Sequence, residues 1–133
     1  MRRGGLTALE GECGPVDVVT IRTTDGRIVC ARCSVANRPW TRLRGLLGRS
    51  GLAADEGMLF PATGSIHTMF MRFPIDVVFL DAELQVLLVR TAVPAWRAAG
   101  QRGAKATLEL AAGAAARSNI APGDRLVRAE APA

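Results

Sequence analysis

The sequence predicts a single, mainly β domain, and three observations support this fold class. Short runs rich in β-branched and other strand-forming residues recur along the chain, and Gly, Pro or acidic residues separate them. An Asp25-Gly26 pair lies between the first two runs, as in hairpins whose turns require positive φ. The length of 133 residues suffices for one domain with a buried core.

The ends of the chain differ from its middle. Residues 1–14 show no sustained periodicity and are rich in Gly, so we expect a mobile leader there. We expect one domain over residues 15–129 and a tail over residues 130–133.

The first half of this domain should contain a hairpin and a helix. The first two strand-forming runs, residues 16–22 and 27–35, should pair with each other. Asn37 then starts a predicted helix, because Pro39 fits a first turn and apolar residues recur after it at helical spacing. Gly48 ends this helix.

The second half should add strands and a short helix. Strands are predicted over residues 57–60, 65–72, 75–80, 85–93 and 105–110. Proline cannot donate a ladder hydrogen bond, so Pro74 should divide residues 65–80 into a strand pair joined at a bend, or one strand with a bulge. An Ala-rich helix over residues 111–118 and an edge strand over residues 125–128 complete the prediction.

Composition argues against several classes of protein. The mean hydropathy is +0.18, yet no apolar run approaches the roughly 20 residues that a membrane-spanning helix needs. We therefore expect no membrane span. No export signal is recognised at the N-terminus, and three cysteines fit a reducing compartment, so we expect a cytoplasmic protein.

The net charge of +5 comes from basic residues that are mostly scattered. A nucleic-acid-binding surface would need clustered cations together with a recognition motif or a row of aromatic side chains. The nearest approach is the group of Arg38, Arg42, Arg44 and Arg49, which we interpret as a solvated helix face. Direct nucleic-acid binding is therefore not favoured.

Several separate stretches resemble a known family. They are RLRGLLGR, GMLF, SIHTMFMRFPIDVVFLD and LELAAGAAARSNIAPGDRLV, in this order, within about residues 35–128. Together they are similar to the bacterial and archaeal family DUF192, a domain of unknown function. The resemblance implies a mainly β fold of sandwich or partly closed barrel type with one or two short helices, and no established biochemical activity.

The central stretch departs from the commonest pattern of this family, because Arg72 stands where that pattern has Lys. Arginine keeps the positive charge and adds a planar fork that holds a carboxylate or phosphate through two hydrogen bonds. An anionic ligand is therefore chemically reasonable in this region. We predict a ligand-binding cluster of Arg44, His67, Arg72, Asp76 and Glu109.

Asp76 precedes the apolar run VVFL, so its carboxylate should enter a mostly apolar environment. A buried Asp needs a cation or several hydrogen-bond donors, because an uncompensated charge would be costly or would take up a proton. Arg72 is the expected partner, directly or through one shared neighbour, and an Arg within residues 42–49 is the alternative. Glu109, between two Leu, is a second acid in an apolar setting.

His67 is the only histidine, and three interpretations of it remain open. It is a structural or pocket-lining residue of the sheet, a base paired with Asp76 in a hydrolase-like enzyme, or a soft-metal ligand beside Met69 and Met71. No convincing nucleophile accompanies the pair, and same-face neighbours roughly 7 Å apart on a strand rarely converge on one ion. We favour the first interpretation, and assign no catalytic residue and no metal site.

Cys30 and Cys33 form a CxxC motif, which in other contexts marks a redox pair or half of a zinc site. In a regular strand, residues i and i+3 point to opposite faces, with Cα atoms roughly 10 Å apart. We therefore predict that the two thiols lie on opposite sides of a strand and stay unlinked.

These observations favour a small binding or accessory module over an enzyme. The expected partner is a small anionic ligand or a protein that binds near residues 67–76, and no cofactor is indicated.

Overall fold

The computed structural model of the chain describes residues 17–36, 51–67 and 72–130. Nine strands and one helix lie in these ranges: β1 (Asp17–Thr23), β2 (Ile28–Val35), β3 (Glu56–Pro61), β4 (Ser65–His67), β5 (Ile75–Leu80), β6 (Val86–Val93), β7 (Ala98–Gly100), β8 (Ala106–Ala111), α2 (Ala114–Ser118) and β9 (Leu126–Glu130).

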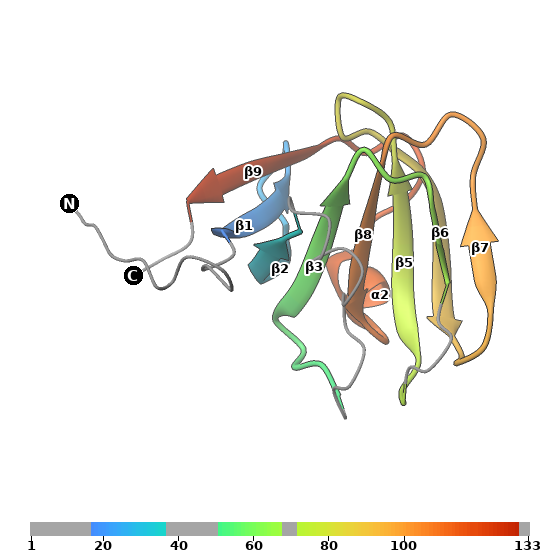
Figure 1. Cartoon of the computed structure of the whole chain (residues 1–133). Helices are drawn as coiled ribbons and strands as arrows, with labels where there is room; N and C mark the ends of the chain where they lie inside the picture. Colours follow the sequence, from blue (N-terminus) through green and yellow to red (C-terminus); the bar gives the residue numbers. More distant parts are fainter. Residues whose placement is uncertain (1–16, 37–50, 68–71, 131–133) are drawn as a thin grey trace, which may run out of the picture.

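Most of the strands form one mixed sheet. Seven strands pair in the order β6-β5-β8-β3-β2-β1-β9 (Figure 1). All neighbours in this sheet are antiparallel except β2 and β3, which are parallel. The short strands β4 and β7 form a separate antiparallel pair.

The large sheet curls until its two edge strands meet at one end. Gln85, just before β6, bridges to Arg125, just before β9. Close by, the N–H of Leu126 donates to the carbonyl of Leu84 at 2.9 Å. Beyond this bridge β9 runs away from β6, so the sheet is not closed into a barrel (Figure 1).

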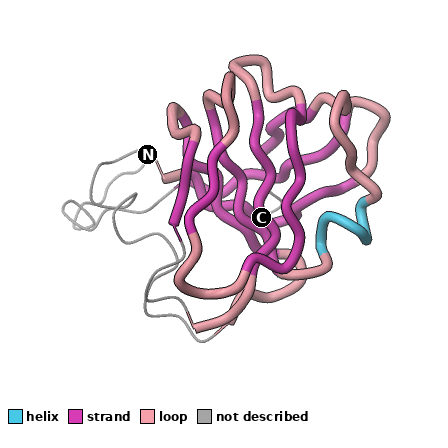
Figure 2. The backbone as a smooth tube through the Cα atoms, turned by 90° about the vertical axis from the view of Figure 1, so that its right-hand side faces the viewer, coloured by secondary structure: helices cyan, strands magenta, loops and turns pink. Residues whose placement is uncertain are grey.

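Every strand of the large sheet contributes to one apolar cluster, which marks the inner face of the curl. This inner core includes Ile21, Val29, Leu59, Val78, Val86, Leu108 and Leu126, one residue from each of the seven strands. The short helix α2, seen in Figure 2 beside one end of the strands, adds Ala114 and Ala115 to the inner core. It thereby covers one end of the curl.

A second cluster, the outer core, lies on the other face of the sheet. It includes Phe60, Val77 and Phe79, and β4 and β7 cover it through Ile66 and Ala99. Both faces of β5 are therefore buried, which explains why residues 77–80 form a continuous apolar run instead of an alternating one.

The mainly β fold is confirmed, with particular corrections. β1 and β2 form the predicted antiparallel hairpin, with a φ of 100° at Gly26, and β9 is the predicted edge strand. Residues 65–80 form neither the predicted strand pair nor one bulged strand. The reason is that β6 and β8 occupy both edges of β5, so β4 pairs with β7 instead.

Two further predictions concern helices. The helix predicted from Asn37 lies outside the described residues. Within the described ranges, no helix is long and apolar enough to cross a membrane.

Candidate functional site

Asp76, near the start of β5, is completely buried and holds three elements together. The N–H of Ala92 donates to its Oδ1 at 2.9 Å, and the N–H groups of Gly113 and Ala115 donate to its Oδ2 at 3.0 Å each. Ala92 lies where the register of β6 shifts and has a φ of 50°. Gly113 is the N-cap residue of α2 and makes no side-chain hydrogen bond to the helix, and Ala115 lies in its first turn.

Of the predicted interaction between Arg72 and Asp76, directly or through one shared neighbour, the direct form is wrong. Arg72 is exposed, and the partners of Asp76 among the described residues are main-chain N–H groups. Three such donors compensate the charge effectively, because hydrogen bonds to an ionised acceptor are short and strong. Arg44, like the alternative partners within residues 42–49, lies outside the described residues.

Glu109, in the middle of β8, is the second buried acid, with 4% of its surface exposed. The register places it between Met58 of β3 and Val77 of β5, both of which belong to the outer core. In the described part of the chain no donor hydrogen-bonds to its carboxyl group, and burial raises the pKa of Glu109 to about 7. The carboxyl group is therefore partly protonated near neutral pH.

Asp76 and Glu109 point to opposite faces of the large sheet. Residues opposite each other in a ladder share a face, and Asp76 pairs with Leu110 of the inner core, whereas Glu109 pairs with Val77. His67 pairs with Ala98 in the β4–β7 sheet, which lies over the outer core, and its side chain is outside the described part. The predicted cluster is thus wrong in joining these two acids, and Asp76 faces away from the strand that carries His67.

Cys30 and Cys33 lie on the same face of β2, contrary to the prediction. The register shifts between the Val19–Cys33 and Ile21–Cys30 pairs, so β2 holds one extra residue there. This β-bulge breaks the alternation and places both cysteines in the inner core. A hydrogen bond between the two thiols lowers the pKa of Cys30 and raises the pKa of Cys33. Both thiols are free, as predicted.

A pocket of about 690 Å³ opens at the end of the curl that α2 does not cover. It lies at the start of β8, whereas α2 follows the end of β8. The lining residues come from β3 and the residue after it, the β5–β6 turn, the β7–β8 connection, the start of β8 and β9: Leu59, Pro61, Ala62, Asp81, Ala82, Leu84, Ala104, Lys105, Ala106 and Arg128. We call it the open-end pocket.

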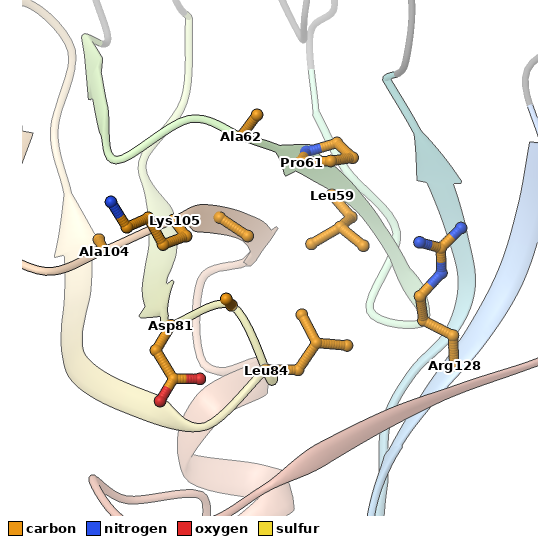
Figure 3. Close-up of a pocket in the computed structure, with 10 residues that line it drawn as sticks. Leu59, Pro61, Ala62, Asp81, Leu84, Ala104, Lys105 and Arg128 are labelled. Atoms are coloured by element: carbon orange, nitrogen blue, oxygen red, sulfur yellow. The ribbon is translucent and has the colours of Figure 1, made fainter.

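The open-end pocket combines apolar and positively charged groups. Leu59 and Leu84 point into it, Arg128 bounds one side, and Lys105 and Asp81 bound the other (Figure 3). The Oδ1 atom of Asp81 already accepts two main-chain N–H groups of its own turn, at 2.9 Å each. Among the residues that the structure describes, no acidic side chain forms a salt bridge with Lys105 or Arg128. The positive charge at the pocket is therefore available to an anion.

The open-end pocket was not identified from the sequence, because its residues are far apart in the chain and none lies within residues 67–76. One local signal existed in β9. Alternation places Arg128 on the same face as the apolar Leu126, which lies in the inner core, and a charged side chain on a core face indicates a site or an opening.

Fold and pocket together define a small β domain whose curled sheet has a ligand-sized opening at one end. The chain matches the model of the DUF192 family, described as "Uncharacterized ACR, COG1430", over residues 20–128. It belongs to this family, so the resemblance seen in the sequence is confirmed.

Three similar proteins come from three different organisms. A UPF0127 protein of Thermococcus sibiricus is 31% identical over 111 residues, which are 80% of this chain and 71% of the relative. A solved structure of a protein of unknown function from Novosphingobium aromaticivorans is 26% identical, with a TM-score of 0.72 over 94% of this chain and 99% of that chain. A Sinorhizobium meliloti protein, provisionally named as a transcription regulator, is 26% identical, with a TM-score of 0.73 over 84% and 92%.

Proposed function

We propose that this protein is a non-catalytic binding module that takes up a small anion in the open-end pocket. The observation that carries the proposal is an apolar floor flanked by Lys105 and Arg128, neither of which is in a salt bridge with a described acid. Concave sites with apolar walls and a few charged groups, particularly at the mouths of barrel-like sheets, are the usual small-molecule sites. The proposal keeps the anionic ligand of the sequence prediction and moves its site away from residues 67–76.

A hydrolase-like role for His67 and Asp76 is less well supported. A general base must come within hydrogen-bond reach of the proton that it removes. Both carboxylate oxygens of Asp76 are engaged by main-chain N–H groups on the inner face, whereas β4 lies over the outer core. The geometry of Asp76 is that of a structural residue.

The proposal is tested by titrating ¹⁵N-labelled protein with inorganic phosphate, acetate and octanoate. We expect at least one of these anions to cause saturable shifts of the amide resonances of Leu84, Lys105 and Arg128. The double variant Lys105→Gln/Arg128→Gln should lower the affinity about tenfold or more, because it removes both charges.

A matched control is Arg22→Gln. Arg22 is also an exposed arginine of the β1–β9 region, and it pairs with the exposed Val127, so it lies on the face away from the inner core. This variant should bind like the unmodified protein. Absence of saturable shifts with all three anions, or equal weakening by the control and the double variant, would show that the proposal is wrong.

A further inference from the structure

Arg128 is the charged residue best placed to anchor a ligand inside the open-end pocket. It pairs with Ile21, which is 1% exposed and belongs to the inner core, so both side chains lie on the inner face of the sheet. Its neighbour Val127 faces outward and is exposed. Arg128 therefore brings a guanidinium group to the edge of the apolar interior.

The other charged groups at the pocket are oriented differently. In Figure 3 the ammonium group of Lys105 and the carboxylate of Asp81 point away from the space between Leu59 and Leu84. Arg128 borders this same space beside Leu59. The interior of the pocket thus offers one cation next to an apolar surface.

The apolar surface continues the inner core. Leu59 and Ala106 are core residues with 2% and 6% exposure, and Leu84 packs against the same core. A compact polyanion such as phosphate would meet few donors here and would leave this surface in contact with water. An apolar chain would cover it.

We infer that the ligand is an amphipathic carboxylate, with an apolar chain against Leu59, Leu84 and Ala106 and one acid group on Arg128. The inference rests on the proposed function and narrows it to one chemical class. A planar guanidinium group holds a carboxylate through two parallel hydrogen bonds. The volume of about 690 Å³ accommodates a chain of about eight carbons with room to spare.

Isothermal titration calorimetry with three probes tests the ligand class. Octanoate has both the chain and the acid, 1-octanol has the chain alone, and inorganic phosphate has charge alone. We expect octanoate to bind about tenfold or more tightly than either of the other probes. Arg128→Gln should reduce octanoate affinity to that of 1-octanol, while Arg22→Gln should leave it unchanged.

Leu84→Asn tests the apolar part. Leu84 has a φ of 64°, a conformation that Asn tolerates well, so the substitution removes apolar surface without straining the turn. It should weaken octanoate and 1-octanol by similar factors. If the variant does not fold, the methyl resonances of Leu59 in the unmodified protein give the same information, because octanoate should shift them and phosphate should not.

The outcomes separate the two proposals. If phosphate binds as tightly as octanoate and both depend on Arg128, the pocket is an anion site and the amphipathic class is wrong. If octanoate binds equally well to the Arg128→Gln and Arg22→Gln variants, the anchoring role of Arg128 is refuted. If neither octanoate, acetate nor phosphate binds, the inference and the proposed function both fail.

Discussion

Replacing Asp76 by Ala should destabilise the fold strongly, because this side chain joins β5 to β6 and α2. The substitution leaves three main-chain N–H groups without their acceptor: that of Ala115, whose hydrogen bond is buried, and those of Ala92 and Gly113, whose hydrogen bonds are partly buried. Each unsatisfied buried group costs about 1–3 kcal/mol, and relaxation of the short helix recovers part of the sum. The substitution also removes the carboxylate, so no uncompensated charge is left buried. We therefore expect a loss of about 3–5 kcal/mol in the free energy of unfolding.

The measurement is urea denaturation followed by far-ultraviolet circular dichroism, with comparison of midpoints at equal m-values. Asp81→Ala is the matched control. The Asp81 carboxylate also accepts two main-chain N–H groups, but it lies in a half-exposed turn where water replaces the lost acceptor. The control should cost only about 1 kcal/mol.

Asp76→Asn gives a second measurement if the Ala variant does not fold. The amide keeps one oxygen acceptor but turns its NH2 group toward a main-chain N–H donor. The free energy of unfolding should therefore fall by about 1–3 kcal/mol. A loss below about 1 kcal/mol for Asp76→Ala, or equal losses for Asp76→Ala and Asp81→Ala, would refute the assignment of Asp76 as the residue that joins these elements.

Two further predictions concern Glu109 and Gly57. The native pKa of Glu109 is about 7, above its ordinary value of 4.5, so the native state holds its proton more tightly than the unfolded state does. Stability from this group is therefore fully present below about pH 4.5 and falls as the pH rises to 7, by about 3 kcal/mol in total. Glu109→Gln should flatten this profile in urea titrations at pH 5 and pH 8, and parallel profiles of the two proteins would contradict the explanation. At Gly57 an added Cβ would lie 2.8 Å from both Cys30 Sγ and the Glu109 carbonyl oxygen, whereas at Gly51 it would meet nothing within 4 Å. Gly57→Ala should therefore lower the free energy of unfolding by about 2 kcal/mol or more, and Gly51→Ala by less than about 0.5 kcal/mol. Similar urea midpoints for the two variants would show that β2 and β8 shift to accommodate the added Cβ more easily than we expect.

Local chemistry was enough to predict most strands and turns. Asp25-Gly26 marks the first hairpin because Gly adopts the required positive φ without strain, and Gly26 has a φ of 100°. Alternation in β9 likewise predicted an edge strand, and β9 is the edge of the large sheet. These features depend on residues that are neighbours in the chain, so local sequence patterns are enough to predict them.

Features that depend on distant partners were not predicted correctly. The bulge in β2 follows from its register with β1, and the CxxC spacing alone gives no sign of it. For Asp76 the need for compensation was correctly inferred, but the donors are main-chain N–H groups, which nearly every residue carries and no pattern marks. The open-end pocket joins residues from 59 to 128, so its charge and its apolar floor meet only in the folded sheet.

Asp76 acts at one end of the curled sheet and Arg128 at the other. Substitutions at these two residues should therefore affect the free energy of unfolding and octanoate affinity independently. Asp76, near the start of β5, accepts hydrogen bonds from the N–H groups at the start of α2, whereas the open-end pocket begins after Leu80 at the end of this strand. The four steps from Asp76 to Leu80 span about 13 Å, beyond the roughly 7–10 Å within which substitutions usually couple. We therefore expect Asp76→Asn to lower the free energy of unfolding equally with and without Arg128→Gln, to within about 0.5 kcal/mol. At a temperature where Asp76→Asn remains folded, its octanoate affinity should stay within about twofold of the unmodified protein. A large loss of affinity in that folded variant would mean that α2 controls the shape of the pocket through the sheet, and the separation of stability from binding would then be wrong.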